Sequence, residues 1–225
     1  MATSSPRVAG RPDATIPDVP EVVVQRLPLY VRVLAFFEGR GNEMVSSEQL
    51  AARLQMTPAQ IRKDLSYFGK FGKQGRGYNV RRLSVELRRI LGLDRTWNAC
   101  LVGVGRLGRA IISYPGFQPE GFRVVAAFDA DSALIGTEVG DLKVDPLADI
   151  PAKVHRLNIR IGIVAVPAQH AQTVIDRLVE AGIKAILNYA PVAAQVPTSV
   201  RVANIDPVLG LQSMTYHLKN KNSRG

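Results

Sequence analysis

The spacing of apolar residues changes near residue 95 of this chain. Before that point they recur every three or four positions, which predicts helices, and the first helix should span residues 21–39 and end at Gly39. Beyond it, short continuous apolar runs alternate with helical segments, which is typical of parallel strands joined by helices. We therefore expect a helical part followed by an α/β part.

Capping residues locate two further short helices in the first part. Ser46 or Ser47 should begin the second helix. Thr57 suits an N-cap, Pro58 suits the first helical position, and Gln60 completes a capping box for the third helix. Two short helices with a tight turn between them predict a helix-turn-helix.

The segment that follows is rich in glycine and cannot be helical. Residues 69–78 (GKFGKQGRGY) hold four glycines with basic and aromatic residues between them, which predicts a β-hairpin, the wing of a winged helix. A helix over residues 81–91 should then lead into the second part.

The second part reads as a parallel sheet with helices on both faces. A further short helix is expected within residues 146–154. The expected strands are 99–102, 124–128, 161–166, 185–188 and 201–204, and the expected helices are 107–113, 168–181 and 206–220.

Three glycines, at the turn that follows the first of these strands and in the first turn of its helix, are the strongest chemical signal. Gly103 permits a tight turn, Gly105 lets the backbone approach a pyrophosphate, and Gly108 lets the helix pack closely on the sheet. Asp129 closes the next strand and can accept both ribose hydroxyls. No basic residue follows it at positions 130–132, which favours NAD(H) over the phosphorylated cofactor.

Charge points to a polyanionic partner for the first part. The net charge is +10 and the pI is about 10.1, with nine Lys or Arg against two acids between residues 60 and 90. In a helix-turn-helix the third helix enters the major groove. The expected DNA-contacting residues are Gln60, Arg62, Lys63 and Ser66, with Tyr67 near the backbone, and Lys70, Lys73 and Arg76 of the wing.

Other features narrow the class. The lone cysteine, Cys100, rules out an internal disulfide and reads as a core residue. The first twenty residues should be disordered, with no apolar leader, and the apolar runs are too short to span a membrane, so we expect a cytoplasmic protein. The three histidines lack a carboxylate partner at a useful spacing, and no metal-ligand pattern is present, so catalysis is not expected.

The chain resembles the Rex family of redox-sensing transcriptional repressors over residues 21–218, nearly all of the part expected to be ordered. The run 62–69 (RKDLSYFG) is the most specific part of the match. The matching segments are 26–32 (RLPLYVR), 46–50 (SSEQL), 60–69 (QIRKDLSYFG), 75–79 (GRGYN), 103–108 (GVGRLG), 114–117 (YPGF), 128–129 (FD), 166–167 (VP) and 186–191 (ILNYAP).

The resemblance implies a homodimer that binds palindromic operator DNA and is released by NADH, while NAD⁺ competes without causing release. The last helix, residues 206–220, would be swapped onto the partner subunit. Arg32, Tyr114 and Asp206 would form a hydrogen-bond network that differs between the two cofactor states. Val166 and Pro167 would lie near the nicotinamide. The other cofactor-contacting residues would be Gly103, Val104, Gly105, Arg106, Leu107, Gly108, Asp129, Tyr114, Asp206 and Arg32.

Two departures and two alternatives accompany this interpretation. Gln74 stands where the family usually has a basic wing-tip residue. Pro207 stands where the family usually has a larger apolar residue, and a proline at this position also favours a plain N-cap role for Asp206. A dehydrogenase with a basic N-terminal extension is one alternative. The other is a winged-helix regulator that senses another nucleotide such as coenzyme A. The expected domains are a tail (1–20), a winged helix (21–95), a Rossmann domain (96–205) and the C-terminal helix (206–225).

Overall fold

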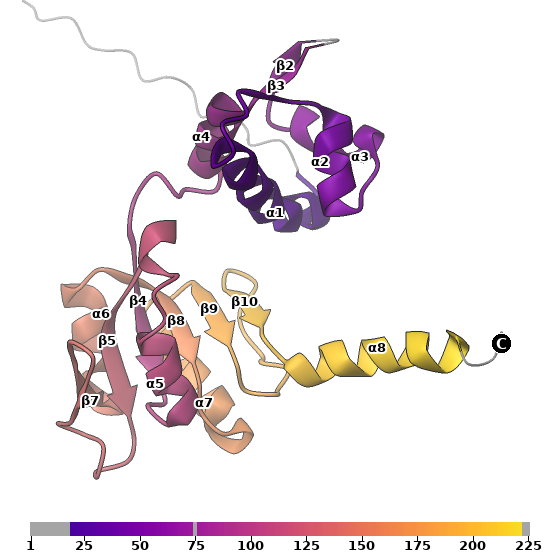
Figure 1. Ribbon diagram of the computed structural model, residues 1–225. Helices are drawn as coiled ribbons and strands as arrows, with labels where there is room; N and C mark the ends of the chain where they lie inside the picture. Colours follow the sequence, from indigo (N-terminus) through magenta and orange to yellow (C-terminus); the bar gives the residue numbers. More distant parts are fainter. Residues whose placement is uncertain (1–18, 74–75, 222–225) are drawn as a thin grey trace, which may run out of the picture. The chain divides into compact units, whose positions relative to one another are not determined.

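The computed structural model describes residues 19–73 and 76–221, which form two compact units divided between Asp94 and Arg95 (Figure 1). The first unit is mainly helical, and the second is built on a large sheet. Most of the expected disordered tail and the wing-tip residue Gln74 lie outside the described residues.

The described residues of the N-terminal unit form four helices and a small antiparallel sheet with the strand order β1-β3-β2. β2 and β3 form the expected hairpin, while β1 was not predicted, because its two residues are too few to show a period. The elements are α1 (Glu21–Glu38), β1 (Met44–Val45), α2 (Ser47–Leu54), α3 (Pro58–Ser66), β2 (Gly72–Lys73), β3 (Gly77–Asn79) and α4 (Val80–Ile90).

Local capping explains where α2 and α3 begin. Ser46 accepts from the backbone N–H of Gln49, whose side chain accepts from the Ser46 N–H, so α2 has a complete capping box. Thr57 caps α3 by accepting from the Gln60 N–H at 3.2 Å. The prediction that Gln60 completes a capping box on α3 is wrong, because the Gln60 side chain donates a hydrogen bond to Asp64 instead of bonding back to the start of the helix.

The core of this unit lies between the inner faces of its helices. Leu27, Tyr30 and Leu34 repeat along α1 at helical spacing and are almost fully buried. They pack with Ile61 of α3 and with Leu83 and its neighbours on α4. Helix α3 is thereby held with one face in the core and the opposite face in solvent.

The C-terminal unit holds a seven-stranded sheet, counted over the described residues, with the order β10-β9-β8-β4-β5-β7-β6. All neighbouring strands are parallel except the pair β6 and β7. The strands are β4 (Trp97–Val102), β5 (Phe122–Asp129), β6 (Glu138–Val139), β7 (Leu142–Pro146), β8 (Ile159–Val164), β9 (Ala185–Asn188) and β10 (Arg201–Asn204).

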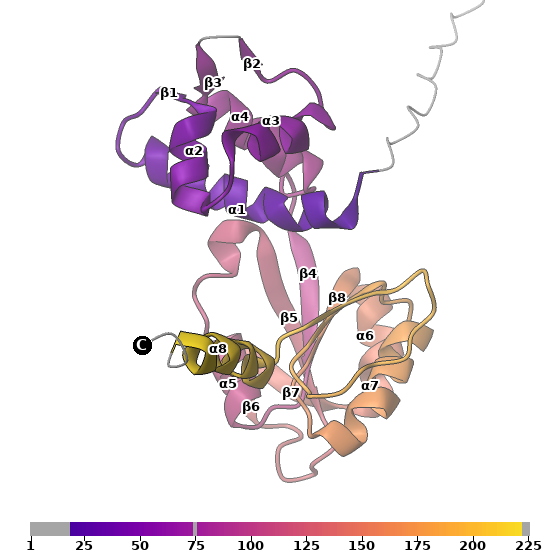
Figure 2. The same cartoon turned by 90° about the vertical axis from the view of Figure 1, so that its right-hand side faces the viewer.

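Helices cover both faces of this sheet, as predicted. α6 and α7 pack together on one face, and α5 lies on the other (Figure 2). One buried cluster, which includes Phe128 and Ile175, fills the first interface, and another, which includes Leu101 and Ile111, fills the second. The helices are α5 (Arg106–Ile112), α6 (Ile150–Arg156) and α7 (Ala168–Glu180), with 3₁₀ turns η1 (Gln118–Glu120) and η2 (Leu147–Asp149).

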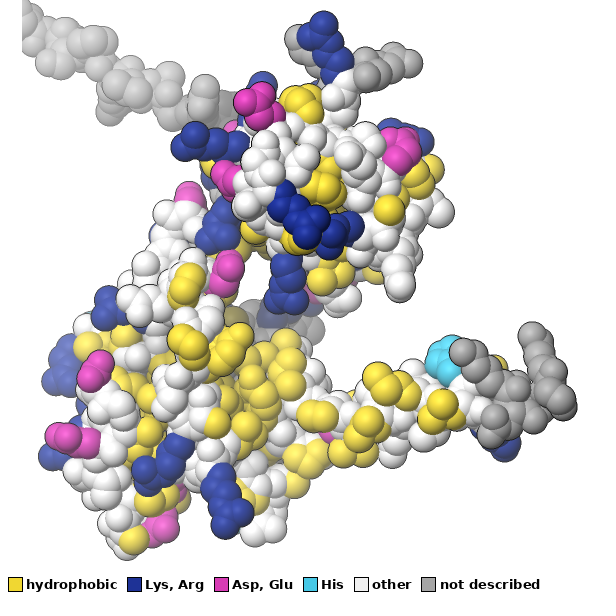
Figure 3. All heavy atoms as spheres, in the orientation of Figure 1, with side chains coloured by type: hydrophobic (Ala, Val, Ile, Leu, Met, Phe, Trp, Pro, Cys, Tyr) yellow, Lys and Arg dark blue, Asp and Glu magenta, His cyan; other side chains and the backbone are white. Residues whose placement is uncertain are grey.

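The last helix, α8 (Pro207–Lys221), carries exposed apolar residues along its length (Figure 3). Exposure of such residues on a single helix marks an unpartnered surface. The exposed apolar side chains are Val208, Leu209, Leu211, Met214, Tyr216 and Leu218.

The expected strands and helices of this unit are present. β9 and β10 have the predicted bounds and the others have shifted ends, while β6 and β7 were not predicted. β8 ends at Val164, two residues before the expected end, because the chain turns there toward α7. β7 has a mixed sequence, Leu-Lys-Val-Asp-Pro, and only Val144 is buried, so its apolar signal is weak. Pairing with β5 makes it a strand.

Candidate functional site

The three glycines of the predicted motif lie in three different environments. Gly103 has φ +99°, and a Cβ there would lie 2.5 Å from the Ala165 carbonyl oxygen. A Cβ at Gly108 would overlap the Gly103 carbonyl oxygen, so α5 packs against the loop only because residue 108 has no side chain. Gly105 faces open space, with nothing within 4 Å of a Cβ. Gly105 therefore leaves room for a ligand to approach the backbone.

Asp129 ends β5 directly beside this glycine loop. Its Oδ2 accepts from the Val104 N–H at 2.6 Å, and its Oδ1 accepts from the Asp131 N–H at 2.9 Å. Each carboxylate oxygen can accept more than one hydrogen bond, so both retain capacity for a hydroxyl donor. The carboxylate thus holds the loop in place and still presents acceptors to a ribose.

A pocket of about 380 Å³ opens at the carboxyl ends of β4, β5 and β8. This is where ligands bind in open α/β sheets. The sequence-predicted residues Gly103, Gly105, Asp129, Val166 and Pro167 line it together. The other lining residues are Val102, Ala130, Asp131, Leu134, Leu147, Ala165, His170, Thr173, Val174 and Arg177.

Several lining residues were missed from the sequence. His170, Thr173 and Arg177 repeat at three- and four-residue spacing along α7 and so share the helix face that borders the pocket. His170 is exposed and borders the pocket. The signal that could have found these residues is their helical spacing directly after the strand-end pair Val166–Pro167.

The remaining cofactor candidates do not line this pocket. Arg32 lies exposed on α1, in the other unit. Tyr114 follows α5, is 58% exposed and packs edge-on against Phe117. Asp206 caps α8 by accepting from the Val208 N–H at 2.9 Å, as its N-cap reading predicted. Val104, Arg106 and Leu107 belong to the loop and the first turn of α5, outside the pocket lining.

One face of α3 is solvent-exposed and carries three of the four DNA-contacting residues predicted on this helix. Ile61, Asp64 and Leu65 are buried, and Gln60 is half-buried at the border between the two faces. Tyr67 follows the helix and is partly buried. The exposed residues of α3 are Ala59, Arg62, Lys63 and Ser66.

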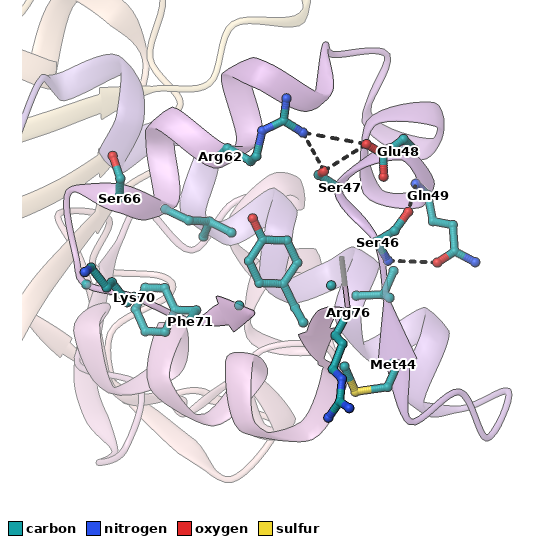
Figure 4. A pocket seen from close by; sticks show the side chains of 16 residues that line it. Met44, Ser46, Ser47, Glu48, Gln49, Arg62, Ser66, Lys70, Phe71 and Arg76 are labelled. Atoms are coloured by element: carbon teal, nitrogen blue, oxygen red, sulfur yellow. Dashed lines mark hydrogen bonds and ion pairs between the residues drawn. The ribbon is translucent and has the colours of Figure 1, made fainter. Parts of the chain in front are cut away.

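A groove of about 800 Å³ lies between α3, the start of α2 and the wing (Figure 4). Arg62 and Ser66 reach it from α3, while Lys70 and Arg76 reach it from the wing segment. The side chain of Lys73 lies outside the described part of the structure, although its backbone forms β2. The groove is cationic and amphipathic, which suits a phosphate backbone.

Arg62 is held in place by the first turn of α2. Its Nη1 donates to the Ser47 hydroxyl at 2.9 Å and lies 3.6 Å from a Glu48 carboxylate oxygen. Both charged side chains are more than half exposed, so the ion pair is weak and Arg62 can exchange it for a phosphate or a base.

Asp64 forms a buried polar cluster that the sequence did not reveal. Arg26 donates to it twice, at 2.6 and 2.8 Å, and Tyr30 donates at 2.5 Å. Burial alone would raise the pKa of Asp64, but hydrogen bonds from Arg26, Tyr30 and Gln60 outweigh it and hold that pKa below its ordinary value. Burial and the bond to Asp64 raise the pKa of Tyr30.

Two further findings bear on function. Across residues 19–73 and 76–221, no helix is both long and apolar enough to cross a membrane. The same residues hold no group of three His, Cys, Asp or Glu side chains placed to bind a metal ion. Cys100 is buried in the core as predicted, and burial raises the pKa of its thiol to about 12.

The fold and these sites define a two-domain protein: a winged helix joined to a Rossmann-type domain. Two families match by sequence, "Putative DNA-binding protein N-terminus" over residues 18–66 and "CoA binding domain" over residues 94–192. The redox-sensing transcriptional repressor Rex of Chloroflexus aurantiacus is 54% identical over 199 residues, which is 88% of this chain and 94% of that protein. The Rex protein of Carboxydothermus hydrogenoformans is 43% identical, over 89% and 97%.

Solved structures agree with the sequence matches. RSP in complex with NAD⁺ and operator DNA is 39% identical and superposes with a TM-score of 0.86, over 91% of this chain and 94% of that chain. RSP in complex with NADH is 36% identical, with a TM-score of 0.82 over 91% and 96%. The chain belongs to the Rex family of redox-sensing transcriptional repressors.

Proposed function

We propose that this chain represses transcription by binding operator DNA and that NADH releases it from the DNA. One observation carries the proposal: a single chain joins an exposed cationic face on α3 and the wing to a pocket in which Asp129 borders the glycine loop. RSP, which matches both units, has been crystallised with operator DNA and with each form of the cofactor.

The DNA contacts divide by position. Arg62 and Lys63 lie on the exposed face of α3, and we propose that they donate to guanine edges and that Ser66 adds a short polar contact. Lys70 and Arg76 at the groove, with Lys73 of β2, serve as phosphate or minor-groove contacts. Tyr67 lies near the sugar-phosphate backbone of the DNA. Gln60 contacts the DNA from the border between the exposed and buried faces of α3.

The pocket fits an adenine dinucleotide without a 2′-phosphate. Gly105 leaves its backbone open to a pyrophosphate, and the N–H groups at the start of α5 are not capped by a side chain. Asp129 offers acceptors to ribose hydroxyls and would repel a phosphate placed there. Val166 and Pro167 form the apolar border for the nicotinamide, whose redox state, when bound, is what the protein reads.

Discrimination between the redox states requires unequal binding to two conformations of the protein. The oxidised ring is cationic and planar, whereas the reduced ring is neutral and puckered. An apolar border favours the neutral ring, and we assign the switch to the network of Arg32, Tyr114 and Asp206. In the structure Asp206 is engaged as the cap of α8, so one carboxylate would serve two roles.

The functional unit is a homodimer with a palindromic operator. The apolar residues exposed along α8 support a swapped helix that packs on the partner subunit. We propose residues 21–95 as the DNA-binding domain, 96–205 as the cofactor domain and 206–225 as the dimerisation segment. Such a repressor works in the cytoplasm, where its DNA is.

Catalysis is not part of the proposal. His170 borders the pocket, and its ring lies 3.3 Å from the Gln169 amide, with no carboxylate of the described residues bonded to it to orient it as an acid or base. Incubation with NAD⁺ and candidate alcohols or hydroxy acids should yield no NADH. Steady turnover would favour the dehydrogenase alternative.

The match to "CoA binding domain" favours one second candidate, coenzyme A or a related nucleotide as the ligand. Asp129 opposes it, because coenzyme A carries a phosphate on its ribose. In this alternative the DNA-binding unit has the same role, and only the ligand that the second unit binds is different.

One binding experiment tests the proposal. Operator duplex is first enriched from a randomised DNA library by the purified full chain, and its complex is then titrated in parallel with NADH, NAD⁺, NADPH and coenzyme A. NADH should release the DNA at the lowest concentration, with a coupling of about 1–3 kcal/mol. If the operator complex persists at saturating NADH, or if coenzyme A dissociates it instead, NADH is not the ligand that releases the DNA.

A further inference from the structure

The buried carboxylate of Asp64 contacts one of the predicted DNA-contacting side chains. The Gln60 amide nitrogen, Nε2, donates to Asp64 Oδ1 at 2.7 Å, one turn along the same helix. The Asp64 side chain has no exposed surface, while Gln60 is half-buried at the border of the outward face of α3. Asp64 therefore holds the side chain of Gln60 from inside the domain.

The chemistry of the two groups decides how Gln60 is oriented. A glutamine amide has a donor end and an acceptor end, and it can turn over when its neighbours allow it. An ionised carboxylate only accepts hydrogen bonds, so the amide nitrogen must face Asp64. The Gln60 oxygen, Oε1, and the second amide hydrogen are then left for groups on the outer side.

The carboxylate is itself held by the first helix. Arg26 and Tyr30, both on α1, donate to the two oxygens of Asp64 over separations of 38 and 34 residues. Four hydrogen bonds of 2.8 Å or less leave the carboxylate little freedom to rotate. The orientation of Gln60 is therefore set by contacts between α1 and α3 and not by its own helix alone.

We propose that Asp64 is a positioning residue for operator recognition, which turns the Gln60 amide so that Oε1 and one N–H are presented to a base. An acceptor and a donor side by side match N6 and N7 of adenine in the major groove. The inference rests on the proposed function, because it assigns a role to a residue of the same DNA-binding face. It adds that the reading of one base pair depends on a buried residue that never touches DNA.

The test compares base preferences of full-length variants. The duplex enriched by the unmodified chain is changed at one base pair at a time, and binding of each duplex is measured by fluorescence anisotropy. The variants are Gln60→Ala, Asp64→Asn, the combination of both, and Tyr30→Phe. Tyr30→Phe is the matched control, because it removes one donor to Asp64 and leaves the contact with Gln60 in place.

Gln60→Ala should flatten a preference of about tenfold for adenine at one position of each half-site. Asp64→Asn should flatten the preference at that same position, because asparagine can either donate or accept and so lets the amide turn. The combined variant should show no further loss. Tyr30→Phe should lower the melting temperature and keep the preference, so a merely structural role is separated from positioning.

Two variants that leave Asp64 intact keep the test decisive if Asp64→Asn fails to fold. Gln60→Lys retains a donor for Asp64 and should keep the native melting temperature while losing the adenine preference. Gln60→Ala should have a lower melting temperature and should also lose the adenine preference. Equal melting temperatures for these two variants would overturn the inference.

Other outcomes are equally clear. An adenine preference that Asp64→Asn keeps and Gln60→Ala removes would overturn the positioning role alone. A Gln60→Ala chain with unchanged preferences at every position would overturn the whole inference, because Gln60 would then read no base. An unmodified chain that enriches no duplex would overturn the proposed function and this inference with it.

Discussion

Asp129 performs two tasks at the end of β5. Its carboxylate accepts the Val104 N–H at 2.6 Å and so holds the glycine loop, and it borders the pocket where a ribose would lie. Charge-assisted hydrogen bonds of this kind are typically stronger than neutral ones. We therefore propose that this single side chain links the shape of the loop to the selection of the ligand.

Substitution of Asp129 by alanine should weaken NADH binding and leave operator binding intact. Loss of hydrogen bonds to a charged acceptor typically costs about 1.5–3 kcal/mol, which is roughly a 10- to 150-fold loss in affinity. The measurement is the NADH concentration that releases half of the bound operator duplex. Asp141→Ala, which changes an exposed acid away from the pocket lining, is the control. Loss of DNA binding by a folded Asp129→Ala chain would contradict the assignment of roles.

The buried Asp64 makes the stability of the fold depend on acid. Its pKa is lower in the folded chain than the ordinary value, so its ionised form stabilises the fold above the unfolded pKa of about 3.9. That contribution is lost as the pH falls through the lower folded pKa.

The melting temperature should therefore fall more steeply with acid in the unmodified chain than in Asp64→Asn. The difference should develop between about pH 5 and pH 2, where the unfolded and then the folded carboxyl take up a proton. Circular dichroism melts across this range would measure it, with Asp141→Asn as a control for exposed acids. Parallel curves for the unmodified chain and Asp64→Asn would refute the role of the cluster.

At the scale of elements, the turn from β4 into α5 separates packing from ligand binding. Gly108 lies where α5 touches the loop, and a side chain there would meet the Gly103 carbonyl oxygen. Gly105, three residues earlier, faces open space. We therefore propose that Gly108 serves the packing of the fold and Gly105 serves the ligand.

Alanine at these two positions should have different consequences. Gly108→Ala should destabilise the cofactor domain and lower its melting temperature by several degrees, since about 1 kcal/mol shifts it by roughly 2–4 °C in a chain of this size. Gly105→Ala should keep the native melting temperature and lose NADH affinity, because its Cβ occupies space that the pyrophosphate needs. Thermal melts and NADH fluorescence titrations of both variants check this. Equal effects on stability would contradict the assignment.

At the scale of the whole molecule, most apolar side chains of α8 are left exposed by the described residues of their own chain. More than 60% of the surface is exposed in each of Leu209, Leu211 and Met214. Burial of such side chains against a second copy would contribute about 25 cal/mol per Å² of apolar surface. A dimer also supplies the two heads that a palindromic site requires.

Removal of residues 207–225 should convert the dimer to a monomer and weaken operator binding by at least about a hundredfold, because the two heads no longer bind as a linked pair. Sedimentation velocity and anisotropy with the enriched duplex would measure both effects. Circular dichroism should show that the truncated chain keeps its α/β domain. A truncated chain that remains dimeric would place the dimer contact elsewhere.

Local sequence signals determined most of the elements and the class of the ligand. The caps at Ser46 and Thr57, the period of α1 and the glycines at the start of α5 act within a few residues, so they can be read directly. Contacts between distant segments were decided only by tertiary structure. The Asp64 cluster joins residues 34 to 38 positions apart, and Asp129 meets Val104 across 25 positions. Spacing along the chain carries no signal for such pairs, because folding alone brings them within hydrogen-bond distance.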